Sequence, residues 1–137
     1  MSELIDLISR EEFNEFFYKF KGKDLLKNVK ILLEKLLEKI DFDLKINNGS
    51  IHLLKGKETF LACGFRRSKD YYFIEFFSEK HINDAKIAKE IIIKDMKRNL
   101  KIKNRNADNI IYQVEIKDEN DIDKNIIDWI IKSYKLV

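Results

Sequence analysis

The first apolar residues of the chain are spaced as in an amphipathic helix. Phenylalanines three and four positions apart share one face of such a helix: Phe13, Phe16, Phe17 and Phe20. Ser9 and Glu12 have the spacing of a capping box, in which both side chains bond the first amides of a helix. Gly22 can adopt the left-handed conformation that commonly ends a helix. The pattern predicts a first helix over about residues 10–21.

A second and longer apolar stripe follows Asp24, a residue type that caps helices well. Its members recur with the helical period: Leu25, Leu26, Val29, Leu32, Leu33, Leu36, Leu37 and Ile40. The stripe covers about two heptads, fewer than the three or four that indicate a coiled coil. We therefore expect a helix pair that packs into the core.

After Phe42 the apolar period shortens to two, which is the period of a strand. Asn47-Asn48-Gly49-Ser50 predicts a hairpin turn, because these residues tolerate positive φ. Further turn residues separate three more strands, over 51–54, 59–65 and 71–77. Together the four strands predict an antiparallel meander.

Alternation in the strand 59–65 places two sets of residues on opposite faces. One set is Thr59, Leu61, Cys63 and Phe65, and the other is Phe60, Ala62 and Gly64. Since both faces are fairly apolar, we expect helices over one face of the sheet and another covering over the second.

The last third of the chain mixes both periods. Residues 83–99 fit a helix by spacing and a strand by the run Ile91-Ile92-Ile93, and we expect a short helix near 84–89 with a strand beyond it. Residues 110–116 predict a strand, and the acidic residues from Asp118 to Asp123 cap a final helix. The apolar face of the strand is formed by Tyr112, Val114 and Ile116. The apolar stripe of the helix is formed by Ile126, Ile127, Trp129, Ile130, Ile131 and Tyr134.

These elements predict one α+β domain over residues 1–137, in which an N-terminal helix pair and a C-terminal helix pack on an antiparallel meander sheet. The composition agrees, because 45% hydrophobic and 37% charged residues permit a core and exclude wholesale disorder. The single cysteine, Cys63, allows no internal disulfide and favours a reducing compartment, so we expect a cytoplasmic protein. We expect no signal peptide and no membrane association, because the start lacks a basic region and no apolar run is long enough to span a bilayer.

The net charge of +3 is unevenly distributed. Residues 86–105 hold eight basic and two acidic residues, and the acidic start of the last helix follows them. An exposed segment of this kind would contact phosphates, and the candidates are Lys97, Arg98, Lys101, Lys103 and Arg105. We favour neutralisation by the neighbouring acidic residues, so nucleic-acid association is the alternative function and not the preferred one.

Candidate catalytic chemistry is sparse. Cys63 would act as a nucleophile only as a thiolate, which needs a base such as His52 or His81 beside it. A cysteine in the middle of a strand among apolar neighbours is, however, typical of core packing. Two histidines without a carboxylate at ligand spacing do not complete a zinc site, so we expect no metal and no cofactor. Glu115-Ile116-Lys117 matches the Glu-x-Lys element of restriction-type nucleases. Polar and apolar residues also alternate in this way in any half-exposed strand. We predict no catalytic residue.

Aromatic residues are dense in the predicted sheet. With Arg66, Arg67 and Lys69 beside them they would stack bases or shelter an apolar ligand, although aromatics most often build the core. Tyr72, Tyr112 and Trp129 are the candidates for a ligand groove where the second face of the sheet is incompletely covered.

Several short segments resemble an uncharacterised bacterial family of small α+β domains, a domain of unknown function sometimes labelled a predicted transport protein. The segments span most of the chain: Gly49-Ser50-Ile51-His52-Leu53, Phe60-Leu61-Ala62, Phe73-Ile74-Glu75-Phe76, Asn120-Asp121-Ile122-Asp123, Asp128-Trp129-Ile130 and Ser133-Tyr134. Family members often carry histidines in the last strand, where this chain has Tyr112 and Gln113. The resemblance implies the fold and no activity. We therefore expect a non-enzymatic binding or interaction module whose partner is a protein or a small molecule.

Overall fold

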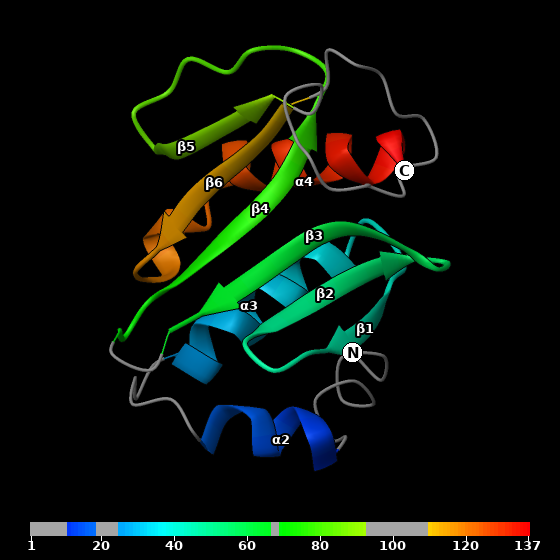
Figure 1. The fold of residues 1–137 in the computed structure, drawn as a ribbon, viewed down its shortest axis with the longest axis vertical. Helices are drawn as coiled ribbons and strands as arrows, with labels where there is room; N and C mark the ends of the chain where they lie inside the picture. Colours follow the sequence, from blue (N-terminus) through cyan, green and yellow to red (C-terminus); the bar gives the residue numbers. More distant parts are fainter. Residues whose placement is uncertain (1–10, 19–24, 67–68, 93–109) are drawn as a thin grey trace.

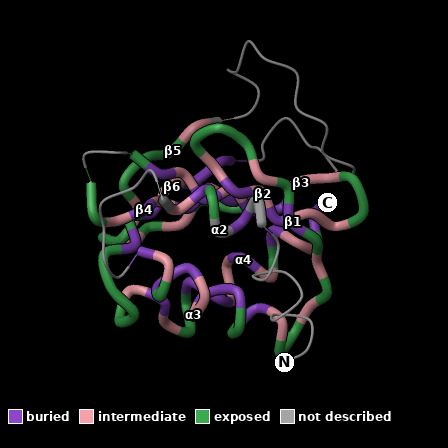
Figure 2. Tube along the Cα trace, turned by 90° about the horizontal axis from the view of Figure 1, so that it is seen from below, coloured by how far each residue is buried: buried purple, intermediate pink, exposed green. Residues whose placement is uncertain are grey.

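In the part of the chain that the structure describes, residues 11–18, 25–66, 69–92 and 110–137, six antiparallel strands form one sheet. The structure is a computed structural model. Helices α3 and α4 lie together on one side of the sheet, with buried positions along the strands and on both helices (Figures 1 and 2). The predicted α+β class, with an antiparallel sheet and a C-terminal helix packed on it, is confirmed.

The elements follow the chain in an order close to the predicted one. They are α2 (Glu11–Tyr18), α3 (Leu25–Leu37), β1 (Asp43–Ile46), β2 (Ser50–Lys55), β3 (Glu58–Phe65), β4 (Tyr72–Ser78), β5 (Ile87–Ile92), β6 (Ile110–Ile116), the short 3₁₀ helix η2 (Glu119–Asp121) and α4 (Lys124–Leu136). The first four strands form the predicted meander, and β6 lies between β4 and β5, giving the order β1-β2-β3-β4-β6-β5.

Alternate residues of the strands face the helices and form one core. The strand side of the core is Leu44, Ile51, Leu53, Leu61, Cys63, Phe65, Tyr72, Ile74, Phe76, Tyr112, Val114 and Ile116. The helix side is Leu25, Val29, Leu32, Leu33 and Leu36 of α3 with Ile126, Ile127 and Ile130 of α4. Each such side chain stabilises the fold by roughly 1.5 to 3 kcal/mol through burial.

Helix α2 joins this core through its phenylalanines, as the sequence predicts. Phe13 and Phe16 are buried, and the ring of Phe16 packs edge-on against Phe65 at 5.1 Å between centroids. The predicted capping residues Ser9 and Gly22 lie outside the described residues.

A β-bulge at Phe60 corrects the predicted faces of β3. The pairing with β2 shifts between Leu53 and Leu54, so that Leu54 pairs with Thr59 and Phe60 is the extra residue. Thr59 therefore lies on the same face as His52, and their side chains meet at 3.3 Å, whereas Phe60 is fully buried. Side chains of a strand do not alternate strictly between its two faces across a bulge, because one inserted residue reverses the faces beyond it.

The turn between β1 and β2 forms as predicted, but without positive φ. The amide of Asn47 donates to the carbonyl of Ser50 at 2.9 Å, and no described residue of this turn has positive φ. The amide of Phe65 donates to the carbonyl of Gly49 at 3.0 Å, so pairing with β3 holds the turn in place. Gly56, in the next turn, has a φ of 63°.

The predicted short helix near 84–89 is wrong, since β5 begins within it at Ile87. A single turn remains, in which the amide of Ile87 donates to the carbonyl of Asp84 at 3.1 Å. Pairing of Glu90 with Tyr112 and of Ile91 with Ile111 joins β5 to β6. The β-branched residues follow the strand preference because a partner strand distant in sequence is present.

The acidic start of the last helix is confirmed. Asp118 and Asp121 form a capping box at η2, and Asp123 accepts a hydrogen bond from the amide of Ile126 at 3.0 Å as the N-cap of α4. None of the helices in the described ranges combines the length and apolar character that a membrane crossing requires.

Candidate ligand-binding groove

A groove of about 420 Å³ lies where the end of β4 and the loop after it meet α4. The described residues that line it come from two stretches of the chain: Phe76, Phe77, Ser78, Glu79, Lys80, His81 and Ile82; Trp129, Lys132, Lys135 and Leu136. Ligand pockets of proteins usually enclose roughly 300 to 1,000 Å³, so this groove is large enough for a small organic molecule.

The apolar part of the groove rests on the core. The half-buried ring of Trp129 stacks on Phe76, with centroids 5.9 Å apart and an interplanar angle of 22°. Phe76 in turn packs on Tyr112 at 6.1 Å between centroids. The ring of Trp129 is therefore supported by the core.

Helix α4 is attached to the sheet beside the groove by the buried hydroxyl of Ser133. This hydroxyl donates to the carbonyl of Phe60 at 2.7 Å and accepts a hydrogen bond from the amide of Phe77 at 2.9 Å. The hydrogen-bonded pairing of β3 with β4 ends at Leu61 and Phe76. At the next pair of residues, Phe60 and Phe77, the hydroxyl of Ser133 takes the place of the direct hydrogen bond between the strands. Beyond this point the two strands diverge (Figure 1).

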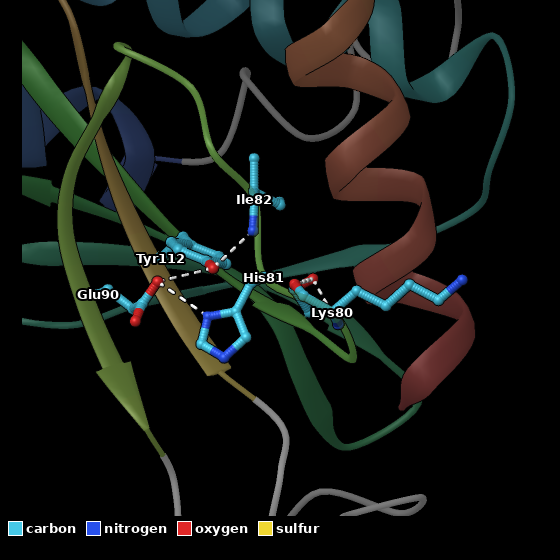
Figure 3. A network of polar contacts seen from close by, with 6 residues as sticks. Lys80, His81, Ile82, Glu90 and Tyr112 are labelled. Atoms are coloured by element: carbon cyan, nitrogen blue, oxygen red, sulfur yellow. Dashed lines mark hydrogen bonds and ion pairs between the residues drawn. The ribbon is translucent and has the colours of Figure 1, made fainter.

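The loop wall of the groove is fixed from the sheet. The amide of Ile82 donates to the hydroxyl of Tyr112 at 2.7 Å, and this hydroxyl donates to the Glu90 carboxylate at 2.8 Å. His81 Nδ1 lies 3.4 Å from the same carboxylate oxygen, so Glu90 stands between the imidazole and the phenol (Figure 3). Burial and the negative charge of Glu90 raise the pKa of Tyr112, which keeps the phenol protonated as a donor.

The groove lies on the helix-covered side of the sheet, not on the second face where the sequence predicts it, and the three residues predicted for it have different roles in the structure. Trp129 lines the groove. Tyr112 lies behind it and holds the loop wall through the amide of Ile82. Tyr72 is fully buried, and its hydroxyl donates to the carbonyl of Asn28 in α3 at 3.4 Å. Tyr72 therefore belongs to the helix-covered core.

The groove also has a basic rim that the sequence analysis did not single out. Lys132 and Lys135 of α4 and Lys80 of the loop are exposed, and the only carboxylate among the described lining residues is that of Glu79. The signal in the sequence is the helical spacing of Trp129, Lys132 and Leu136, which share a face. The other wall, distant in sequence, has no comparable signal.

Cys63 and His52 lie on opposite faces of the sheet. The side chain of Cys63 is in the helix-covered core, and burial raises the pKa of its thiol to about 12. Burial and the charge of Lys45 lower the pKa of His52, whose ring nitrogens face Thr59 and Ser50. The two side chains therefore form no thiol and base pair.

Glu115 and Lys117 lie at an exposed end of β6, where the ammonium is 3.7 Å from the carboxylate. Within the described ranges, no group of three His, Cys, Asp or Glu side chains is placed to hold a metal ion.

The five candidate phosphate contacts, Lys97, Arg98, Lys101, Lys103 and Arg105, lie outside the described residues. At the start of the basic segment 86–105, Lys86 forms an ion pair with Asp123. The hydrogen bond between their side chains raises the pKa of Lys86. This contact is of the neutralising kind that the charge distribution leads us to expect.

Comparison of the chain with protein-family models, with curated proteins and with solved structures finds no match. The groove is therefore interpreted from its own geometry.

Proposed function

We propose that the protein is a non-enzymatic binding module that holds a small molecule in the groove between β4 and α4. The observation that carries this proposal is a groove of about 420 Å³ whose aromatic surface, the half-buried ring of Trp129, rests on the buried core residue Phe76. A preformed apolar concavity with a few polar groups at its rim is the usual form of a ligand site.

The fixed loop wall supports the same function. Because Tyr112 bonds the amide of Ile82 from inside the sheet, the groove keeps its form without the entropy cost of ordering a loop on binding. The single cysteine favours a cytoplasmic location for this module. The resemblance to an uncharacterised bacterial family stays a prediction and implies no activity.

The experiment uses Trp129, the one tryptophan of the chain, as a reporter inside the groove. Titration with decanol, a neutral alkyl probe, should change the fluorescence of Trp129 saturably. Ile82→Phe narrows the groove while leaving the backbone amide of residue 82 in place, and should weaken binding about tenfold or more.

The control is Ile31→Phe, the same substitution at a half-buried position on α3 outside the groove. It should leave the affinity unchanged. Absence of a saturable response to every alkyl probe tried, with the fold intact by circular dichroism, would overturn the proposed function.

Nucleic-acid association through residues 86–105 remains the alternative. Of the two described cations of this segment, Lys86 is paired with Asp123, while Lys89 is exposed on β5. The contact that the structure describes there favours neutralisation, so the groove is the better-supported site.

A further inference from the structure

The groove combines an apolar surface with cations, and this combination identifies a class of ligand. The inference rests on the proposed function and specifies it: we infer that the ligand is a small amphipathic anion. Its apolar body lies along Trp129 and Ile82, above the buried ring of Phe76, and its carboxylate end lies between Lys132 and Lys135.

Within the described ranges, the ammonium groups of these two lysines have no partner. Among the described residues, neither Lys132 nor Lys135 takes part in an ion pair or a side-chain hydrogen bond. Other described lysines do: Lys86 pairs with Asp123, Lys35 donates to the carbonyl of Ile122 at 2.9 Å, and Lys55 donates to that of Tyr134 at 3.2 Å. The groove thus concentrates ammonium groups that have no partner in the described part of the protein.

The nearby acidic groups do not cancel this field. Glu90, which accepts the hydrogen bond of Tyr112 and faces His81, keeps its negative charge but is not among the described lining residues. Asp128 precedes Lys132 by one helical turn, but is not among the described lining residues and forms no ion pair with it. Lys80, Lys132 and Lys135 against Glu79 leave the described rim with an excess of two positive charges.

The apolar surface determines what kind of anion fits. A lysine keeps its ammonium group in water while its methylene stem lies on apolar surface, and both Lys132 and Lys135 line the groove. An ion with an apolar body would bury that body against the ring of Trp129 and keep its charge at the wet rim. A fully hydrated inorganic anion would leave the aromatic surface unused.

The experiment compares three probes with the same alkyl chain and different ends: decanoate, decanol and decyltrimethylammonium, each below its micelle concentration. Binding is followed by Trp129 fluorescence and by isothermal titration calorimetry. For the wild-type protein we expect decanoate to bind about tenfold more tightly than decanol, since a charge-assisted hydrogen bond contributes that order of affinity, and the cation to bind most weakly. Raising the salt concentration should reduce the advantage of decanoate alone.

The double variant Lys132→Met/Lys135→Met retains the length of both stems and removes both charges. It should abolish the preference for decanoate, so that decanoate binds no more tightly than decanol. Lys124→Met, at the other end of α4 and outside the described groove lining, is the matched control and should retain the preference for decanoate.

The outcomes separate the two proposals. Equal binding of decanoate and decanol, weakened together by Ile82→Phe, would overturn the amphipathic anion and leave the binding function standing. A preference for decanoate that persists in the double variant would also overturn the assignment to Lys132 and Lys135. No binding of any probe would overturn both.

Discussion

The hydroxyl of Ser133 accepts a hydrogen bond from the amide of Phe77 at 2.9 Å, in the position where a neighbouring strand would supply a carbonyl. The same hydroxyl donates to the carbonyl of Phe60 at 2.7 Å. A side chain of α4 thus completes the hydrogen bonding of β3 and β4 where the two strands separate. The groove begins at this separation.

Ser133→Ala should lower the free energy of unfolding by roughly 1 to 3 kcal/mol, because the buried carbonyl of Phe60 and the amide of Phe77 would both lose their partner. Chemical denaturation measures the change. Ser50→Ala, at a half-buried position on β2, is the control and should cost less. A loss for Ser133→Ala no larger than that of the control would contradict the bridging role.

Tyr112→Phe should release the loop wall of the groove, because the amide of Ile82 and the carboxylate of Glu90 would lose the phenol between them. We expect a stability loss of about 1 to 2 kcal/mol and faster hydrogen exchange of the Ile82 amide. Tyr134→Phe removes a hydroxyl from a half-buried tyrosine of α4 and should leave that exchange rate unchanged. Unaltered exchange in Tyr112→Phe would show that the loop is held by other contacts.

Gly64→Ala should destabilise the protein through a steric conflict with Phe73. An added Cβ at position 64 would lie 2.5 Å from Cε2 of the Phe73 ring, which covers this glycine from β4. The ring must shift, at a cost of about 1 to 3 kcal/mol. In a Phe73→Ala background the same substitution should cost much less, and denaturation of the four proteins of this cycle measures the coupling. Equal costs in both backgrounds would exclude the conflict.

Cys63 should resist alkylation in the folded protein. Burial raises the pKa of its thiol from 9.0 to about 12, so little thiolate is present at pH 8. Iodoacetamide labelling followed by intact mass should be slow in buffer and fast in denaturant. Rapid labelling of the native protein would contradict the burial.

The same pKa shift predicts how stability depends on alkaline pH. Above about pH 9 the unfolded chain loses the thiol proton while the folded protein retains it, so the free energy of unfolding falls as pH rises toward about 12. Cys63→Ala should make this decline shallower, as measured by denaturation between pH 8 and about 10.5.

Nucleic-acid binding is tested by fluorescence anisotropy with random duplex and single-stranded oligonucleotides at about 50 and 200 mM salt, where phosphate contacts lose most of their affinity. We expect no micromolar binding. Binding at the lower salt that weakens steeply at the higher, and that is abolished by charge reversal at Arg98 and Lys101, would establish the alternative function.

Local periodicity predicted the elements whose pattern is complete within one segment. The stripe of α3 and the alternation of Tyr112, Val114 and Ile116 in β6 are of this kind. The prediction of a helix near 84–89 is wrong because the structure of Ile87 and Ile91 is decided by pairing with β6, whose partner residues Val114 and Ile111 are distant in sequence. The bulge at Phe60 is likewise a property of the pairing with β2, and β3 alone does not reveal it.

The candidate site was predicted only in part for the same reason. Trp129 is among the three groove residues that the sequence predicts, but the wall opposite it depends on how α4 meets β4. Ser133 has no helical or strand pattern that marks it as a bridge between Phe60 and Phe77. The sequence alone does not single out Lys132 and Lys135, because the apolar surface and the loop that line the groove with them come from a distant part of the chain.

The two walls of the groove are distant in sequence and meet only when α4 docks on the sheet. The unfolded chain therefore contains no such site, and a ligand that occupies the groove binds the native state alone. By thermodynamic linkage, its binding must raise the melting temperature as its concentration exceeds the dissociation constant. In a thermal-shift screen of metabolites, a compound that binds the groove would therefore be detected from the stabilisation itself, before anything is known of its structure.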